Sequence, residues 1–496
     1  MNNATESRDV DDVLIDRILG LPESYYFDCK RILGKVDKLL ETVIAFANSE
    51  GGTIALGLED PLKADGRDRV FGLQEHPENW DELRRKLRSR ITEAELLPVT
   101  LQEIPCTLRN GSVGTVGLVR ISKSNRVHSI VDNGTYVRLE KGNKEITATE
   151  INDLCFARGT ISAESQLVEV DFELLDTEYW RSYAAQRGLT RNLADALYHA
   201  GLAKKNLSGE LRPTMAAVLL FAEDPSGLLA GKTAIRVFHY RGTAVSTAPN
   251  TNLAKPPVTI GGPLIRQIRE ARQVVIRELG ERVQHGPLGF EIVQKYPLRV
   301  IDEAITNAVI HRDYRLPSDV MVRIFSDRIE VESPGAFPGG VTASNIHRIG
   351  TQPRNKLIVQ HLREFASPPN LDAGEGVRMM FGTMRNAGLY PPMYLTRPRI
   401  EREAVVVHLW NQNRPSIWEQ VMDYLDKQGS IGNSELRKLL ATDDTLAASR
   451  KMKQWVEQGL LVVANPSSPK KMRRYCRPGG DAGPSSLSSP SENEPS

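Results

Sequence analysis

The segment Asp302–Tyr314 sets a carboxylate and a carboxamide four residues apart inside an apolar pattern. Its letters, DEAITNAVIHRDY, repeat apolar residues at the spacing of a buried helix. Two side chains four positions apart on a helix lie one above the other on the same face. We therefore expect a helix that points the side chains of Glu303 and Asn307 in one direction.

Glu303 and Asn307 have the chemistry of a metal-dependent site carried by one helix. An asparagine oxygen can bind Mg²⁺, with waters and nucleotide phosphates at the other positions, and a glutamate one turn earlier can polarise an attacking water. The alternative is a helix whose buried Glu and Asn form hydrogen bonds only to neighbouring loops. That explanation is the commoner one for an isolated Glu-x-x-x-Asn spacing, so the context of the motif decides between the two.

The residues downstream add a strand, a hairpin and two glycine-containing loops. Val320–Ile324 alternates like a strand, and Ser326–Arg328 turns into a second strand at Ile329–Glu332. A Gly/Pro loop follows at 333–340, and Gly374–Val377 opens a further helical pattern. Because a glycine loop at a helix N-terminus offers backbone N–H groups to an anion, this second loop is a candidate for phosphate binding.

Together these residues resemble the divergent Bergerat-type (GHKL) ATPase domain at the C-terminal side of RecG-like, Schlafen AlbA-containing bacterial proteins. The resemblance covers Leu298 to about Tyr394, and its specific part is E-x-x-x-N-A-x-x-H-R-D-Y, with the D-R-I-E-x-x-x-P-G loop at Asp327–Gly335. It implies an α/β sandwich with ATP and Mg²⁺ as cofactors, in which Glu303 is the general base and Asn307 the Mg²⁺ ligand. The nucleotide-binding positions that it implies are Asn307, His311, Ser333, Gly335, Gly374 and Gly376.

One departure from the family pattern bears on activity. Bergerat ATPases usually read adenine with an Asp in D-x-G-x-G, whereas this chain has Glu332-Ser333-Pro334-Gly335. The segment Phe365–Ala373 also replaces the usual lid loop. The resemblance therefore implies nucleotide binding with at most weak ATP hydrolysis.

Two signatures near the N-terminus resemble the Schlafen AlbA-type domain over about residues 13–158. They are E-S-x-x-x-E-x-K, read here from Glu23, and the more specific A-F-A-N-S-x-G-G-x-x-x-x-G-x-x-D from Ala45 to Asp60. The resemblance implies a nucleic-acid-binding α/β domain. In nuclease-active Schlafens two carboxylates and a following Asp bind a divalent metal, which corresponds here to Glu23, Asp28 and Asp60. Asp28 stands where the family usually has Glu.

Other roles for these carboxylates stay open. They can pair with neighbouring cations or border a phosphate-binding groove without any catalysis, and many prokaryotic relatives are regarded as DNA-binding domains. Basic residues of this domain are candidate phosphate contacts, although an isolated run of charge is more often a solvated face. The candidates are Lys30, Arg31, Arg84, Arg85 and Arg88.

Residues 415–476 follow the order of a winged helix. Helices are predicted at Ile417–Lys427, at Ser434–Leu440 with Ser434 as N-cap, and at Leu446–Gln458, before a short strand. The third helix and the wing carry basic residues suited to a groove and its phosphates; the alternative is a solvated face or a winged helix that binds protein. These residues are Arg450, Lys451, Lys453, Lys470, Lys471, Arg473 and Arg474.

The region between the two resemblances contains a loop that imitates a phosphate-binding motif. Short helices at Glu178–Arg187 and Leu193–Ala200 precede a predicted strand at Ala217–Ala222. Ser226–Thr233 is then similar to a Walker A loop, but serine replaces its first glycine, and the strand-like Ala234–Tyr240 follows where a helix is required. A P-loop is therefore not predicted, because the helix dipole that it uses has no candidate here.

The composition indicates an α+β multidomain protein. The 496 residues suffice for about three domains. Lys and Arg (64) nearly balance Asp and Glu (62), so nucleic-acid binding must use local patches. Four scattered cysteines and the lack of a signal peptide or a membrane-length apolar run predict a cytoplasmic location. The patterns divide the chain into 10–160 (AlbA-type), 165–295 (α/β connection), 296–412 (ATPase-like), 415–476 (winged helix) and 477–496 (disordered tail).

The leading hypothesis is an ATP-binding regulator or defence protein that binds nucleic acid, with DNA as the first expected partner and RNA as the second. Mg-ATP would control how DNA is engaged. The alternative is a metal-dependent nuclease of Schlafen type whose ATPase-like region is only a scaffold, and a third hypothesis is an assembly protein with degenerate sites. No membrane partner is expected, and a homodimer is predicted by analogy with Bergerat domains alone.

Overall fold

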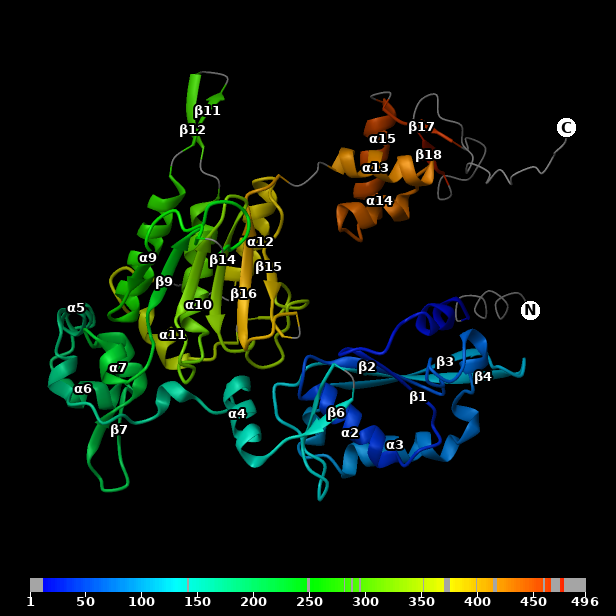
Figure 1. Cartoon of the computed structure of the whole chain (residues 1–496), viewed down its shortest axis with the longest axis horizontal. Coiled ribbons are helices and arrows are strands. Elements are labelled where there is room, and N and C mark those ends of the chain that lie inside the picture. Colours follow the sequence, from blue (N-terminus) through cyan, green and yellow to red (C-terminus); the bar gives the residue numbers. More distant parts are fainter. Residues whose placement is uncertain are drawn as a thin grey trace. The chain divides into compact units, whose positions relative to one another are not determined.

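The computed structural model describes residues 12–140, 142–247, 250–280, 282–286, 289–293, 296–350, 352–369, 375–397, 399–413, 417–457, 460–464 and 473–476. The chain forms two compact units (Figure 1). The larger unit runs to Asn411, and the smaller unit holds residues 388–390 and the chain from Gln412 onward. Both helices and strands occur in each unit, which confirms the predicted mixed α+β class.

The N-terminal domain of the larger unit is a four-stranded sheet with a hydrophobic core on each face. Its elements are β1 (Phe27–Lys30), α2 (Val36–Ala47), β2 (Gly52–Leu56), α3 (Pro77–Ser89), β3 (Val99–Thr107), β4 (Val113–Ile121), β5 (Tyr136–Arg138), β6 (Asn143–Glu145) and α4 (Ala148–Arg158). The strand order is β1-β2-β4-β3, with β1 and β2 parallel. Leu40 and Ile44 of α2 join Trp80 of α3 in the core on one face.

The Asn-Ser-Glu-Gly-Gly part of the N-terminal signature forms the corner between α2 and β2 and anchors distant backbone. Asn48 Nδ2 donates to the carbonyl oxygens of His128 (2.8 Å) and Tyr136 (3.0 Å), and Asn48 Oδ1 accepts from the N–H of His128 (2.9 Å). Ser49 Oγ accepts from the N–H of Arg138 (2.8 Å). Since a buried amide must find partners, these bonds fix the β5–β6 hairpin to the corner.

The middle of the larger unit contains a helix where a strand is predicted. Its elements are α5 (Glu178–Gln186), α6 (Leu193–His199), β7 (Ala203–Lys205), β8 (Leu211–Pro213), α7 (Met215–Phe221) and α8 (Pro225–Leu228). The predicted strand at Ala217–Ala222 is wrong, because this segment is α7, capped by Thr214, whose side chain accepts from the N–H of Ala217 (3.4 Å). A short run of buried apolar residues fits either element, and the capping threonine is the signal that distinguishes them.

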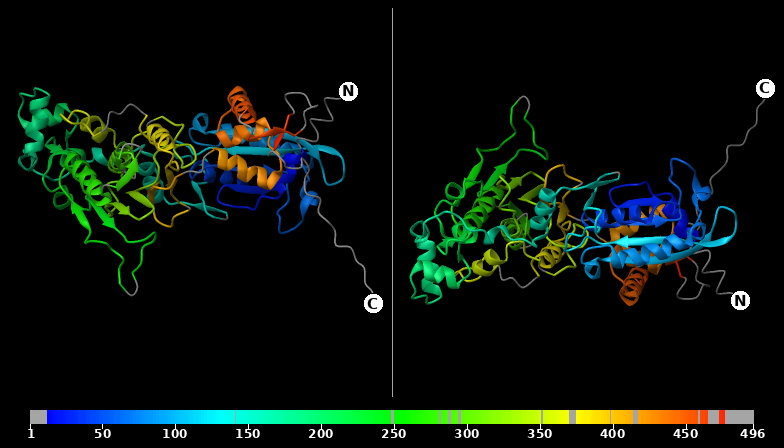
Figure 2. Two further views of the ribbon diagram at one scale, coloured as in Figure 1. Left: turned by 90° about the horizontal axis from the view of Figure 1, so that it is seen from above. Right: turned by 90° about the horizontal axis from the view of Figure 1, so that it is seen from below.

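The rest of the larger unit is built around a six-stranded mixed sheet. This part of the chain contains β9 (Ile235–His239), β10 (Val258–Ile260), α9 (Leu264–Leu279), β11 (Arg282–Gly286), β12 (Gly289–Val293), α10 (Leu298–Ile310), β13 (Val320–Ile324), β14 (Arg328–Pro334), α11 (Lys356–Leu362), α12 (Gly376–Asn386), β15 (Met393–Leu395) and β16 (Ala404–Trp410). The order is β10-β9-β13-β14-β16-β15, and only β9 and β13 are parallel. Helices α9 and α10 pack side by side on the sheet. The hairpin β11–β12 projects from it, in green (Figures 1 and 2).

This sheet crosses the predicted boundary between 165–295 and 296–412. Strand β9 lies before the boundary, yet it pairs along its length with β13, with Ile235 opposite Val320. Parallel strands need a long crossover connection, so their pairing has no local sequence signal. The apparent Walker A loop at Ser226–Thr233 leads into β9 and not into a helix, as the sequence predicts.

The smaller unit contains three helices and a two-stranded sheet around its own core. Its elements are α13 (Ile417–Gln428), α14 (Asn433–Leu440), α15 (Thr445–Glu457), β17 (Val462–Val463) and β18 (Tyr475–Cys476). Ser434 is not the N-cap of α14; Gly432 holds that position, and its N–H donates to Glu435 (3.1 Å). The helix begins one residue earlier than predicted because this glutamate completes the cap. Residues 477–496, predicted to form a disordered tail, lie outside the described residues.

Candidate functional site

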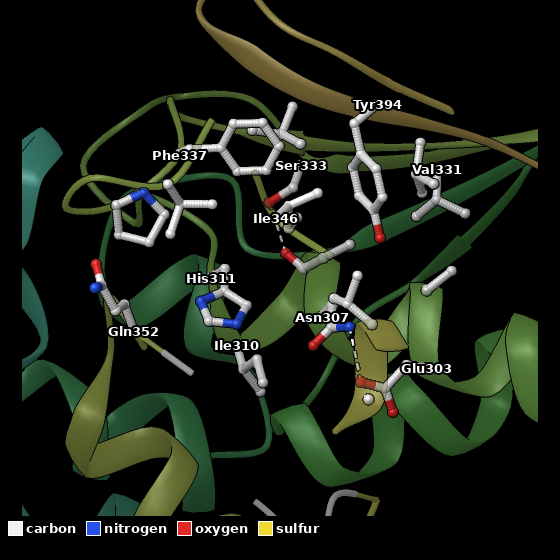
Figure 3. Close-up of a pocket in the computed structure, with 18 of the residues that line it drawn as sticks. Glu303, Asn307, Ile310, His311, Val331, Ser333, Phe337, Ile346, Gln352 and Tyr394 are labelled. Atoms are coloured by element: carbon white, nitrogen blue, oxygen red, sulfur yellow. Dashed lines mark hydrogen bonds between the residues drawn. The ribbon is translucent and has the colours of Figure 1, made fainter. Parts of the chain in front are cut away.

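A cavity of about 370 Å³ lies in the larger unit, beside α10 and against the loop that follows β14 (Figure 3). We call it the α10 cavity. Pockets for small molecules usually measure about 300–1,000 Å³, so its size suits such a ligand. The predicted residues Glu303, Asn307, His311, Ser333, Gly335 and Gly376 all line it, whereas Gly374 lies outside the described residues.

Glu303 and Asn307 lie one turn apart on α10 and share a hydrogen bond. Asn307 Nδ2 donates to Glu303 Oε1 at 2.8 Å (Figure 3). Burial raises the pKa of Glu303, although the hydrogen bond from Asn307 opposes the rise. Because the amide nitrogen faces the carboxylate, the Asn307 oxygen is turned away from Glu303 and is available as a ligand atom, of the kind that hard cations prefer.

Gly376 begins α12 directly against Glu303. A β-carbon at position 376 would overlap Glu303 Oε1, because the two atoms would be far closer than non-bonded atoms can approach. Any other residue would therefore displace the carboxylate. Glu375 and Val377 also line the cavity, so the start of α12 and the carboxylate share one edge of it.

Two residues that follow α10 donate side-chain hydrogen bonds to backbone carbonyl oxygens. Arg312 is 1% exposed and donates to the carbonyl oxygen of Ser318 (2.7 Å). The hydroxyl of Tyr314 donates to the carbonyl oxygen of Val309 (3.0 Å), at the end of the helix. Half of the H-R-D-Y part of the motif is thus structural, since these side chains bind backbone and do not line the cavity.

Asp313 fixes the loop that closes the cavity. Its carboxylate pairs with Arg354 (3.4 Å), which donates to the carbonyl oxygens of His311 (3.1 Å) and Ala336. Gly335 has φ +103°, and a β-carbon there would lie 2.8 Å from the β-carbon of Asp313. His311 lines the cavity, and burial lowers its pKa to about 4, so its ring is neutral at pH 7 and offers no positive charge to a phosphate.

The end of β14 turns Ser333, and not Glu332, toward the cavity. Successive strand residues face opposite sides of a sheet. Glu332 accordingly pairs with Arg323 (2.6 Å) and Arg402 (2.6 Å) and does not line the cavity. Ser333 Oγ donates to the carbonyl oxygen of Ala308 (2.7 Å), so toward a ligand this hydroxyl can only accept a hydrogen bond.

Three prominent cavity residues, Phe337, Gln352 and Tyr394, have no signal in the sequence (Figure 3). The Tyr394 ring lies 5.9 Å from that of Phe337. Burial, followed by the charge of Glu303, raises the pKa of Tyr394, which places its hydroxyl near that carboxylate. Tyr394 arrives on β15 through its pairing with β16, and such a long-range contact leaves no local pattern.

The three predicted metal-binding carboxylates of the N-terminal domain have different surroundings in the structure. Asp28 is 3% exposed and pairs with Arg138 (2.9 Å) and Lys30 (3.0 Å). Glu23 lies close by, since burial and the charges of Asp28 and Asp60 raise its pKa. Among the described residues, however, no three His, Cys, Asp or Glu side chains are grouped as metal ligands. Asp28 already has two cationic partners within the protein, and the binding of a metal by the three carboxylates stays a prediction.

The basic residues predicted to contact phosphate in the N-terminal domain differ in whether they form ion pairs within the protein. Lys30 pairs with Asp28, Arg31 is held by two glutamates, and Arg84 by one. Arg85 and Arg88 on α3 are exposed and make no ion pair with any described residue. These two arginines are therefore the candidates that need not break a protein contact to meet a phosphate.

The smaller unit offers fewer free cations than its sequence suggests. Arg450 of α15 is exposed, whereas Lys453 pairs with a glutamate of the same helix (3.5 Å), and Lys451 lies over the Trp455 ring (5.6 Å). Arg474 pairs with a glutamate of α14 (3.3 Å), and Arg473 is partly buried. Lys470 and Lys471 lie outside the described residues.

Comparison with known proteins confirms the two family resemblances predicted from the sequence. Residues 23–147 match the Schlafen AlbA_2 family model, and residues 318–406 match the model described as the C-terminal part of a putative ATP-dependent DNA helicase, recG. No match was found among curated proteins. The chain is also similar to the crystal structure of the DIP2311 protein from Corynebacterium diphtheriae, with 17% identity, coverage of 96% of this chain and 98% of that chain, and a TM-score of 0.41.

The AlbA match and the RecG-like match in one chain indicate a nucleic-acid-associated, ATPase-like protein. Within the part of the chain that the structure describes, no helix is both long enough and apolar enough to cross a membrane.

Proposed function

We propose that the α10 cavity binds ATP with Mg²⁺ and that bound nucleotide controls how the protein engages DNA. The observation that carries this proposal is the Glu303–Asn307 pair, in which an acid and an available amide oxygen meet in a cavity of suitable size. The match of residues 318–406 to a RecG-like C-terminal domain supports an ATPase-like role. Helices α9 and α10 on a mixed sheet also suit a Bergerat-type sandwich.

The cavity residues fit a magnesium-bound nucleotide. Val331, Phe337 and Ile346 give apolar wall for a purine ring, and the Asn307 oxygen is a hard ligand for Mg²⁺. Bound Mg²⁺ supplies charge neutralisation for the phosphates. Glu303 has the position and the raised pKa of a general base. Since Glu332–Gly335 and Phe365–Ala373 depart from the adenine-reading motif and the lid loop of Bergerat ATPases, we infer nucleotide binding with slow hydrolysis.

The nucleic-acid side of the proposal uses both units. The AlbA match and the exposed Arg85 and Arg88 support phosphate contacts by the N-terminal domain. Three helices followed by a two-stranded sheet suit a winged helix, with Arg450 on its third helix. We take DNA as the partner and a cytoplasmic transcriptional or defence-related regulator as the role, with RNA as the second ligand to test.

The wall of the α10 cavity gives a physical route for control. Lys123 Nζ donates to the carbonyl oxygen of Phe337 (3.2 Å), and Arg158 donates to the carbonyl oxygen of Gly339 (3.0 Å). Both cations belong to the N-terminal domain. A nucleotide that moves this wall therefore changes contacts with the DNA-binding domain, and it shifts the DNA equilibrium only by its own preference between the two arrangements.

Calorimetry with Mg-ATP tests the nucleotide site. We expect binding by the full-length protein and loss of binding in Asn307→Ala, with unchanged circular dichroism. Asn250→Ala, an exposed asparagine outside the cavity, is the matched control and should bind like the wild type. Equal affinity in all three proteins removes the site.

DNA affinity, measured by fluorescence anisotropy with and without Mg-ATP, tests the control. The proposal requires a nucleotide-dependent change in the wild type that is absent in Asn307→Ala. Nucleotide binding without any change in DNA affinity would leave the site intact and overturn the regulatory role.

A further inference from the structure

A second cavity, of about 620 Å³, lies in the larger unit where the N-terminal domain meets the loop beyond β14. We call it the interdomain cavity. We propose that it binds a phosphate-bearing anion. Its charged lining residues are Lys123, Arg126, Arg158 and Lys356, and among the described residues no aspartate or glutamate lines it.

The positive charge in this cavity comes from separate parts of the fold. Lys123 and Arg126 follow β4, Arg158 ends α4, and Lys356 begins α11. Glu50 pairs with Lys123 (2.9 Å) and Glu93 with Arg126 (4.0 Å), but neither carboxylate lines the cavity, and the four cations that converge on it repel one another. An anion in the cavity would be attracted by all four, and it would relieve that repulsion.

The two deepest cations lack sufficient negative partners. Arg158 is 5% exposed and donates to the carbonyl oxygens of Gly339 and Ser49, each at 3.0 Å, but it makes no ion pair with any described residue. Its Nε is buried and has no hydrogen-bond partner among these residues. Lys123 has one carboxylate, Glu50 at 2.9 Å, yet burial and the Arg158 charge lower its pKa to about 8. The charge of Glu50 acts on both buried cations, so one carboxylate faces two positive charges. The excess positive charge is costly unless an anion joins the cluster.

A phosphate group suits this arrangement better than a carboxylate does. Arginine guanidinium groups and lysine ammonium groups both bind phosphate oxygens well. A phosphate monoester carries about −1.5 to −2 charges at pH 7, against −1 for a carboxylate, and so offsets more than one cation. The Thr160 hydroxyl also lines the cavity and can donate to an oxygen. Either a small phosphorylated molecule or a phosphorylated nucleic-acid end presents this group.

The interdomain cavity also touches the α10 cavity. Pro338 and Gln352 line both of them, so one loop forms a shared wall. A phosphate in the interdomain cavity would contact this wall from the side opposite to a nucleotide. The site itself stands independently of the proposed nucleotide function, because its cations line the interdomain cavity alone.

Binding of inorganic phosphate to the full-length protein, measured by calorimetry in chloride buffer of matched ionic strength, tests the site. The diagnostic variant is Arg126→Ala/Lys356→Ala, because both side chains are exposed and their loss should leave the fold intact. The control is Lys204→Ala/Lys205→Ala, which removes the same charge from exposed positions on β7. We expect phosphate affinity to fall about tenfold or more in the diagnostic variant only.

Asn307→Ala separates this site from the nucleotide site. Unchanged phosphate affinity in Asn307→Ala is expected, even if ATP binding is lost. Loss of phosphate binding in Asn307→Ala, or equal affinity in the diagnostic and control variants, would overturn the proposal. Absence of measurable phosphate binding by the wild type would overturn it as well.

The source of the phosphate is resolved by a pair of oligonucleotides that differ only in a 5′ phosphate. Tighter binding of the phosphorylated strand, lost in Arg126→Ala/Lys356→Ala, assigns the cavity to nucleic-acid ends. Equal binding of the two strands, together with phosphate binding, assigns it to a small phosphorylated molecule.

Discussion

The sequence predicts two sites with acidic residues, one around Asp28 and one around Glu303. In the structure, the carboxylates of these two sites have different partners. Around Asp28, Arg138 and Lys30 neutralise the carboxylate inside the N-terminal domain. Around Glu303, the partner is a neutral amide, and the pair opens into a cavity. The comparison shows that an acidic residue of a sequence motif is available to a ligand only where no protein cation pairs with its carboxylate.

The same contrast holds within one motif. Glu303 and Asn307 line the α10 cavity, while Arg312 and Tyr314, a few residues later, bind backbone. Asp313 lies between these roles, because its ion pair with Arg354 holds the loop that forms the cavity wall. A motif can thus combine a site and the support of that site.

The largest effect is expected for Asp28→Ala. This change leaves Arg138, whose side chain is 2% exposed, without its carboxylate, and breaking a buried ion pair usually costs about 3–5 kcal/mol. Urea unfolding followed by circular dichroism measures the loss. Asp81→Ala is the control, since its pair with Arg84 is exposed (3.8 Å) and should contribute about 0–1 kcal/mol. Equal free energies of unfolding for the two variants would contradict a structural role for Asp28.

A smaller effect of opposite sign is expected for Glu303→Gln. The pKa of Glu303 is raised above 4.5 in the folded protein, so the folded state loses stability as pH rises from 4.5 through the raised value. Glutamine removes this loss and keeps the hydrogen-bonding shape, so the melting temperature at pH 7 should equal or exceed that of the wild type. Melting curves at pH 4 and pH 7 measure this. A large destabilisation by Glu303→Gln would make Glu303 structural and end the contrast with Asp28.

The smallest effect is expected for Asp60→Ala. Because Arg138 and Lys30 already hold Asp28, which would share a metal with Asp60, we expect no Asp60-dependent cleavage when labelled tRNA, single-stranded DNA and duplex DNA are incubated with Mn²⁺. Cleavage that disappears in Asp60→Ala but persists in Glu303→Gln would restore the nuclease alternative.

Local patterns were sufficient where one face of an element is apolar. Strand β13 matches its predicted bounds, Val320–Ile324, because its alternation of buried and half-buried residues is set by the core that it faces. Helix α7 is the exception. It is buried all round, so its apolar run has no periodicity, and only Thr214 marks the start of a helix.

The features that no local sequence pattern predicts depend on contacts between residues far apart in the sequence. The Glu303–Asn307 spacing placed two site residues correctly on one helix face, but Tyr394 and Phe337 reach the cavity through a strand pairing and a loop. The arginine that neutralises Asp28 is 110 residues away in the sequence. The interdomain cavity depends in the same way on loops and helix ends from distant segments.

The most direct test is a crystal structure of the full-length protein with a non-hydrolysable ATP analogue and Mg²⁺. We predict the nucleotide in the α10 cavity, with Mg²⁺ about 2.0–2.1 Å from Asn307 Oδ1 and Glu303 facing the terminal phosphate. Density for the nucleotide elsewhere, or a cavity closed by its side chains at saturating nucleotide, would contradict the account.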